Sequence, residues 1–91
     1  MGFRATAERS GAVIDYEAML SPAERRVLLY LLAGDSNHQI AKRVGISDKT
    51  VKNHLARILK KTNSATRLEI VVKVYKERVR VLRRRVRERA A

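Results

Sequence analysis

The turn Gly45-Ile46-Ser47 is the feature that most constrains the fold, because it separates two segments whose apolar residues recur at helical spacing. Glycine often ends a helix and serine is a preferred N-cap, so one helix is predicted to stop here and another to start. The first segment is short, with Ile40 and Ala41 on its apolar face, whereas the second, residues 48–61, is longer and basic. Two helices joined in this way form a helix-turn-helix.

Capping signals predict helices on both sides of this unit. Ser21-Pro22-Ala23-Glu24 combines a capping serine, a proline suited to the first helical position and a glutamate that completes a capping box. Gly34 can end that helix, and the pair Ser36 and Gln39 starts the next one in the same way. Downstream, Asn63 suits a left-handed helix end. A fourth helix can then start at Ser64 or Thr66.

The chain shows no strand-like alternation and has one proline, so the predicted class is all-α. We expect a four-helix helix-turn-helix domain with an extended C-terminal helix. We also expect a short helical turn near residues 13–19 that packs on the domain. The predicted parts are a flexible N-terminal arm at 1–19, the helix-turn-helix domain at 20–76 and a basic helical extension at 77–91.

Charge is the most informative part of the composition. Lys and Arg number 21 against 9 Asp and Glu, which gives a net charge of +12 and a pI near 11.1. The excess lies in the middle and at the end of the chain, because residues 1–20 are slightly acidic. A strongly basic small domain is typical of proteins that bind a polyanion, although solubility alone also uses surface charge.

The polar face of the helix at residues 48–61 is predicted to read DNA. Its inward stripe consists of four apolar residues, Val51, Leu55, Ile58 and Leu59. An α-helix fits the major groove of B-DNA, where a lysine can donate to guanine and an asparagine can pair with adenine. Phosphate contacts position a protein without specifying a sequence. The predicted DNA-binding residues are Lys49, Lys52, Asn53, Ala56 and Arg57 on the outer side, and Thr50, His54, Lys60 and Lys61 near phosphates.

The motifs together resemble the LuxR-type (GerE-type) DNA-binding domain of bacterial transcription regulators. The resemblance covers about residues 20 to 76 and rests on Leu20-Ser21-Pro22-Ala23-Glu24, Gly34-x-Ser36-Asn37, Ile46-Ser47 and Thr50-Val51-Lys52-x-His54. It implies a four-helix domain whose third helix enters the major groove and whose fourth helix dimerises. It also implies that Lys52 and Asn53 face bases, with Thr50, His54 and Lys61 near the DNA backbone.

The chain departs from the family pattern at several positions. Ala23 stands where the family usually has arginine, and Arg26 where it often has glutamate. The stretch Lys61-Thr62-Asn63-Ser64 lacks two apolar anchors between the third and fourth helices, which bears on the direction in which the fourth helix leaves. Family members commonly carry an N-terminal receiver or ligand-binding domain, which 19 residues cannot form. We therefore expect either a stand-alone regulator or an excised effector domain.

The C-terminal helix carries an apolar row at heptad spacing. Valine at heptad position a with leucine at d favours a parallel two-stranded coil, so the row is predicted to form a homodimer. A second stripe, Ile70, Val71 and Val74, is predicted to pack on the domain. The predicted dimerisation residues are Leu68, Val72, Tyr75, Val79, Leu82 and Val86.

The charges beside this row leave three alternatives open. The flanking positions are Lys76, Arg78, Arg83 and Arg85, which would face like charges in a homodimer. The tail could dimerise with its arginines on DNA phosphates, pair with an acidic partner helix, or order only on DNA.

Other functions are weighed against this reading. Serines at helix starts are explained by capping, the glycines form no phosphate loop, and His38 and His54 lack other ligands at metal spacing, so no enzyme activity, cofactor or metal is expected. No apolar run approaches the ~20 residues of a membrane span, and no signal-type segment is seen, so a cytoplasmic location is expected.

The alternatives are a sigma-factor-like promoter-reading domain, or a basic interaction module binding an acidic partner or an anionic membrane. Double-stranded DNA is the predicted partner, with RNA polymerase as a further candidate.

Overall fold

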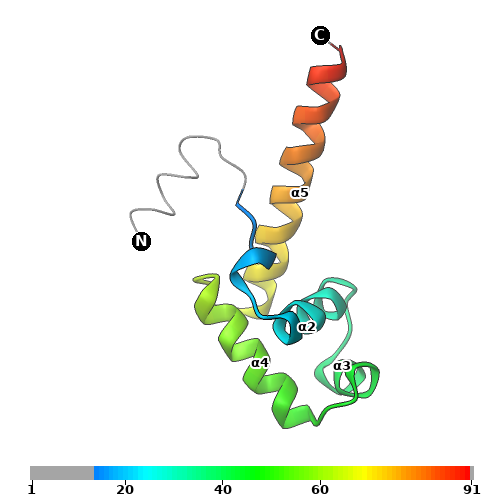
Figure 1. Cartoon of the computed structure of the whole chain (residues 1–91), viewed down its shortest axis with the longest axis vertical. Helices are drawn as coiled ribbons and strands as arrows, with labels where there is room; N and C mark the ends of the chain where they lie inside the picture. The colour runs from blue at the N-terminus through cyan, green and yellow to red at the C-terminus, as the bar shows by residue number, and fades with distance from the viewer. Residues whose placement is uncertain (1–13, 91) are drawn as a thin grey trace.

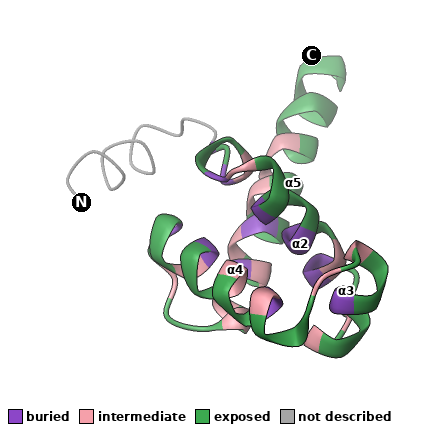
Figure 2. Cartoon of the chain, turned by 60° about the horizontal axis from the view of Figure 1, so that its bottom comes forward, coloured by how far each residue is buried: buried purple, intermediate pink, exposed green. Residues whose placement is uncertain are grey.

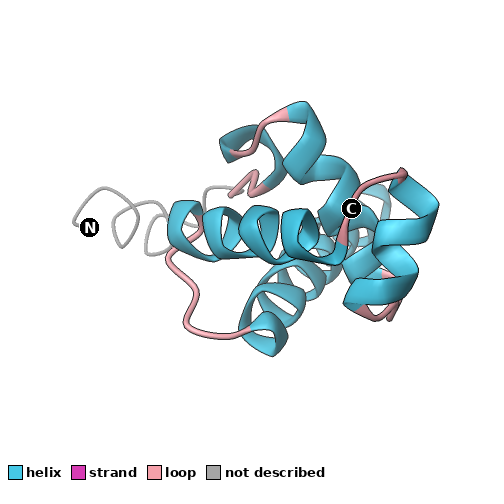
Figure 3. Ribbon diagram, turned by 90° about the horizontal axis from the view of Figure 1, so that it is seen from below, coloured by secondary structure: helices cyan, strands magenta, loops and turns pink. Residues whose placement is uncertain are grey.

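The computed structural model describes residues 14–90, and in this part of the chain all regular structure is helical (Figures 1 and 3). A single 3₁₀ turn, η1, precedes four α-helices that are joined by short loops. The elements are η1 (Glu17–Met19), α2 (Pro22–Leu32), α3 (Asn37–Val44), α4 (Asp48–Lys61) and α5 (Arg67–Ala90). The predicted all-α class is confirmed.

The helix boundaries follow the capping signals. Ser21 and Ser36 each accept a hydrogen bond from the backbone N–H three residues on, and Glu24 and Gln39 return one, which completes two capping boxes. Gly45 ends α3 as predicted, in the left-handed conformation with φ 78°, which its lack of a side chain permits. The N-cap of α4 is likewise the predicted serine, which accepts from the N–H of Thr50.

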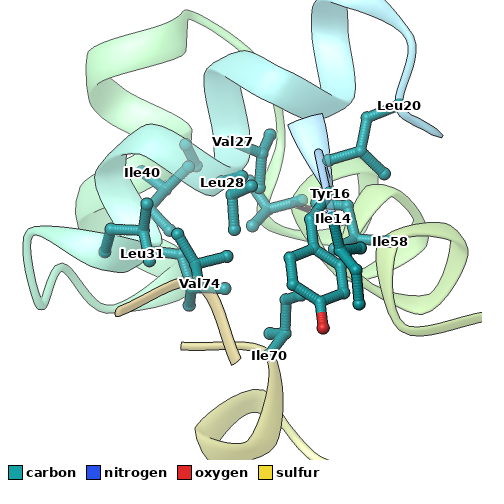
Figure 4. Packing of buried hydrophobic residues seen from close by; sticks show 13 residues of the cluster. Ile14, Tyr16, Leu20, Val27, Leu28, Leu31, Ile40, Ile58, Ile70 and Val74 are labelled. Carbon is teal, nitrogen blue, oxygen red and sulfur yellow. The ribbon is translucent and has the colours of Figure 1, made fainter. Parts of the chain in front are cut away.

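A mainly aliphatic core lies where α2, α3, α4 and α5 meet (Figures 2 and 4). Val27, Leu28 and Leu31 of α2 meet Ile40 of α3, and Ile58 of α4 approaches them from another side. The side chains of Val51, Ile58 and Ile70 are completely shielded from solvent. The predicted inward stripes of α4 and α5 are therefore the ones buried, with Leu55, Leu59 and Val71 half-buried at the edge of the core.

The segment before α2 is part of this core. Ile14 and Tyr16 are buried in the cluster, and the backbone N–H of Ile14 donates to Glu77 Oε1 of α5 at 2.9 Å. An ion pair between Glu17 and Arg78, 2.8 Å long, lies beside this contact. The packing of this segment and the turn η1 agree with the helical turn expected near residues 13–19. Residues 1–13, which include most of the predicted arm and the start of its helical turn, lie outside the described residues.

Polar contacts hold the junction between α4 and α5, where the family pattern has apolar anchors. Thr62 is buried and its hydroxyl donates to the Ile58 carbonyl at 2.8 Å, while Asn63 adopts the predicted left-handed conformation with φ 52°. Lys73 Nζ of α5 donates to the carbonyl oxygens of Thr62 and Asn63 at 3.3 and 2.7 Å. The Lys73 side chain thus ties α5 to the junction, and the burial of Ile70 and Val74 holds α5 against the core.

The second half of α5 projects away from the domain. Every residue from Leu82 to Ala90 is exposed, and the start of α4 and the end of α5 lie at opposite ends of the longest axis (Figure 1). At 1.5 Å per residue, the residues from Glu77 to Ala90 add about 20 Å of helix. The basic extension is therefore directed away from the first turn of α4.

We expect Ile14→Ala to lower the free energy of unfolding by about 2–4 kcal/mol, because it leaves a cavity under the N-terminal segment. Chemical denaturation checks this value. Val79→Ala is the matched control, since Val79 is 44% exposed, and it should change stability by less than about 0.5 kcal/mol. Equal effects of the two substitutions would show that the segment does not belong to the folded unit.

Candidate nucleic-acid interface

The burial of Val51 and Ile58 fixes how α4 is turned about its own axis. Residues three, four and seven apart share a helix face, so the opposite face carries Lys49, Asn53, Ala56 and Lys60 at such spacing. All of these side chains are exposed. The structure thus brings together, on one surface, Lys49, Asn53 and Ala56, which the sequence predicted for the outer side, and Lys60, which it predicted near a phosphate.

The remaining predicted residues lie at the margins of this face. Lys52 and Arg57 are exposed on its two flanks, whereas Thr50 and His54 are half-buried beside the core. With Lys61, the helix carries five cationic side chains and one acid, Asp48, in its 14 residues. The outer side of α4 is therefore strongly positive, as a surface that contacts phosphates requires.

Lys61 has a partner within the chain. Its Nζ lies 2.6 Å from Glu24 Oε1, which links the last turn of α4 to the first turn of α2. Glu24 is only 2% exposed, and the same carboxylate oxygen also accepts from the backbone N–H of Ser21. An ammonium group has three donors, so Lys61 retains donors for a phosphate while it holds Glu24. The sequence motif contains both residues but does not show that they meet.

Burial and hydrogen bonding shift the pKa of the Glu24 carboxyl in opposite directions. Burial raises the pKa of the carboxyl, but the hydrogen bonds from Lys61 and Ser21, together with the charge of Lys61, outweigh it. The pKa of Glu24 therefore lies below its ordinary value of 4.5.

Two other predicted phosphate contacts, Thr50 and His54, differ in their local hydrogen bonding. The hydroxyl of Thr50 lies 2.8 Å from that of Ser47, so the residue is part of the N-terminal cap of α4. His54 Nδ1 is buried and has no hydrogen-bond partner among the described residues. Because an N–H without an acceptor is rarely buried, this favours the tautomer with the proton on Nε2. Nε2 is then the ring donor that His54 can offer to a ligand.

The fold brings together a pair that sequence spacing did not indicate. His38 Nδ1 of α3 lies 3.3 Å from Asp48 Oδ2 at the start of α4, and both side chains are exposed. The two residues are ten positions apart, and only the turn between α3 and α4 makes them neighbours.

Within residues 14–90 no group of three His, Cys, Asp or Glu side chains gathers as a metal site would need. None of the described helices has the length and apolar character needed to span a membrane.

The apolar row predicted on α5 lies on the surface. Each member is between 38% and 69% exposed, and the row runs along the side of α5 that does not face the core. Tyr75 also donates from its hydroxyl to the Leu32 carbonyl at 2.9 Å, which fixes its ring against the domain. The exposed row consists of Leu68, Val72, Tyr75, Val79, Leu82 and Val86.

Comparison with protein families decides the assignment of this helical unit. The family model described as bacterial regulatory proteins of the luxR family (GerE) matches residues 18–74. The chain belongs to this family. LuxR-type regulators bind DNA, so the chain carries a DNA-binding domain of a transcription regulator. The match favours the LuxR-type resemblance over the sigma-factor alternative.

Curated relatives agree with this assignment. The nitrate/nitrite response regulator protein NarL of Escherichia coli (strain K12) is 38% identical over 76 residues, which cover 84% of this chain and 32% of NarL. The monoamine regulon transcriptional regulator of Klebsiella aerogenes is 38% identical over 61 residues, covering 67% and 27%. The transcriptional regulatory protein DegU of Brevibacillus brevis is 41% identical over 58 residues, covering 64% and 25%. The chain thus spans about a third or less of these relatives. No solved structure matches it with significant similarity.

Lys61→Met should lower the free energy of unfolding at about pH 7 by about 2 kcal/mol, because it leaves the Glu24 carboxylate buried without its cation. The loss is smaller than for a fully buried pair, since the Lys61 side chain is 41% exposed. Lys60→Met, one residue away on the exposed face, is the matched control and should have little effect.

The parent protein should in addition lose stability as the pH falls. A carboxyl with a lowered pKa in the folded state stabilises it fully above the unfolded pKa, and this contribution disappears as pH falls through the folded value. Denaturation midpoints measured from about pH 7 down to about pH 3 test the linkage. A Lys61→Met protein with the same acid profile as the parent would contradict it.

Proposed function

We propose that this domain is a sequence-specific transcription regulator that inserts α4 into the major groove of double-stranded DNA. The observation that carries the proposal is the orientation of α4, whose apolar side is buried while its first turns present Lys49, Lys52 and Asn53 to solvent. Residues near the N-terminus of a recognition helix are the ones that reach base edges. The relatives, all named as regulators, support the same class of function.

Base reading is assigned to two side chains on adjacent parts of this face. Asn53 can form a bidentate pair with adenine, and Lys52 can donate to the guanine acceptors O6 and N7. Ala56 lies one turn further on and is exposed, so its small side chain permits close approach of the helix to the groove.

Phosphate contacts are assigned to the margins of the face and to Lys60 in its last turn. His54 offers Nε2, Arg57 and Lys60 are exposed, and Lys61 retains donors beyond its bond to Glu24. Contacts of this kind set register and affinity and make binding depend on salt.

A homodimer on an inverted repeat is the proposed assembly, with contact through the part of α5 nearest the domain. Leu68, Val72 and Tyr75 are exposed apolar residues there, and the neighbouring Glu69 and Val71 avoid the cationic flanks found further along. A two-fold axis at this place would present two copies of α4 to one DNA duplex, as dimeric helix-turn-helix proteins do. Contact of the bound dimer with RNA polymerase stays a prediction.

Lys52→Ala and Asn53→Ala should each reduce discrimination between preferred and altered sites by about 1–3 kcal/mol, the value of a good base contact. The measurement is competition binding of each variant to duplexes that differ by single base pairs.

Lys76→Ala is a suitable control, because it removes an exposed lysine that lies outside α4. It should leave discrimination unchanged. Full discrimination by both α4 variants, with their folds intact, would show that the groove assignment is wrong.

A further inference from the structure

The outer half of α5 has an apolar strip that the DNA-binding role does not use. Val79, Leu82 and Val86 are 44%, 57% and 66% exposed and lie beyond the part of the helix that packs on the core. They recur at spacings of three and four residues and so form one face. The strip continues a shallow groove that starts near the domain at Val72 and Tyr75.

Cations border this strip on both sides. Lys76, Arg80, Arg83 and Arg87 follow one another at spacings of four, three and four residues along one edge of the groove. Arg78 and Arg85 occupy the other edge, where Arg78 pairs with Glu17. Residues 76–89 contain eight basic and two acidic residues. The outer half of α5 is therefore an apolar strip between two rows of positive charge.

This charge arrangement disfavours a second copy of the chain as the occupant. In a parallel pair of identical helices, the Lys76–Arg87 edge of one copy lies beside the Arg78–Arg85 edge of the other. In an antiparallel pair, each edge lies beside the same edge of the other copy. Since both edges are cationic, either orientation sets cations against cations, and like charges at such positions destabilise the pair.

Neither DNA nor a lipid bilayer fits the strip better than a second copy of the chain does. The strip lies toward the end of the molecule opposite to the first turns of α4, which contact the groove in the proposed function (Figure 1). Helices that lie in a membrane surface use Trp, Phe and Leu on the apolar side, whereas this strip has two valines and one leucine.

We propose that the outer half of α5 is a docking site for an acidic amphipathic helix of another protein. Such a helix would place aliphatic side chains on Val79, Leu82 and Val86 and carboxylates beside the two cationic edges. Opposite charges at the flanks of a helix pair set partner choice and orientation. The domain would then bind DNA at one end and a partner at the other. The exclusion of DNA from the strip rests on the proposed function, whereas binding of a partner helix is measured without DNA.

A designed peptide tests the site directly. The probe is a labelled helix of about three heptads with Leu at a and d and Glu at e and g, and its control is a scrambled peptide of the same composition. Fluorescence anisotropy of each peptide with the full chain gives the dissociation constant. We expect the ordered peptide to bind at least about tenfold more tightly than the scrambled one.

Matched protein variants separate the site from general attraction. Arg83→Gln with Arg85→Gln should weaken binding of the ordered peptide about tenfold, whereas Arg25→Gln with Arg26→Gln, an equal charge change on exposed residues of α2, should have little effect. Val79→Ser with Leu82→Ser should abolish binding and leave the far-ultraviolet circular dichroism unchanged, since both side chains are exposed. Equal binding of the two peptides, or equal weakening by the two charge variants, would overturn the proposal.

Three further results would assign the strip to another occupant and so overturn the proposal. The first is dimerisation in sedimentation that Val79→Ser with Leu82→Ser abolishes. The second is tighter binding to vesicles of anionic lipid than to the peptide. The third is a lower salt dependence of DNA binding in the Arg83→Gln, Arg85→Gln variant, because released counterions report phosphate contacts. Sequence selectivity on DNA is read separately, so failure of the docking site and failure of the DNA role are distinguishable.

Discussion

The burial of Val51 and Ile58 against α2 and α3 is the constraint on which the rest of the structure depends. Both side chains are fully shielded, and together they leave one orientation of α4 that keeps its apolar stripe out of water. Because these buried residues determine the orientation of α4, the residues on its outer side face solvent without needing contacts of their own. The two capping boxes and Gly45 serve the same end, since they fix where α2 and α3 begin and where α3 stops.

The link between Glu24 and Lys61 connects this internal order to the candidate DNA surface. One lysine closes the domain between α2 and α4 and at the same time lies at the margin of the face assigned to phosphates. Thr50 combines two roles in the same way, because it is a predicted phosphate contact and its hydroxyl belongs to the cap of α4. In the proposed function, binding DNA and keeping α4 in place are therefore coupled at these residues. A substitution at either one is expected to change both, which is why the exposed residues Lys52 and Asn53 are cleaner probes of base reading.

Most of the fold could be predicted from the sequence, because its signals are local. Serine at the starts of α2, α3 and α4, glycine at the end of α3 and apolar residues at helical spacing each act within a few residues, and the structure confirms them. Contacts between distant parts could not be predicted in this way. The sequence indicated that residues 13–19 pack on the domain, but not that Ile14 meets Glu77 of α5. That contact, the bond from Lys73 to the α4–α5 junction and the pairing of His38 with Asp48 depend on how the helices meet. The residues on the outer side of α4 could be predicted from the helical spacing of its apolar residues. The distance between the basic tail and that side could not, because it depends on the direction in which α5 runs.

The central claim is that the outward face of α4 reads a DNA sequence. Selection from a random duplex library at roughly 0.15 M salt tests it most directly, because non-specific attraction is weakened under these conditions while base contacts persist. The account predicts enrichment of one sequence arranged as an inverted repeat, with the preference reduced in the Asn53→Ala variant. Tight binding without any enriched sequence would contradict it and would leave a basic domain that binds DNA only through phosphates.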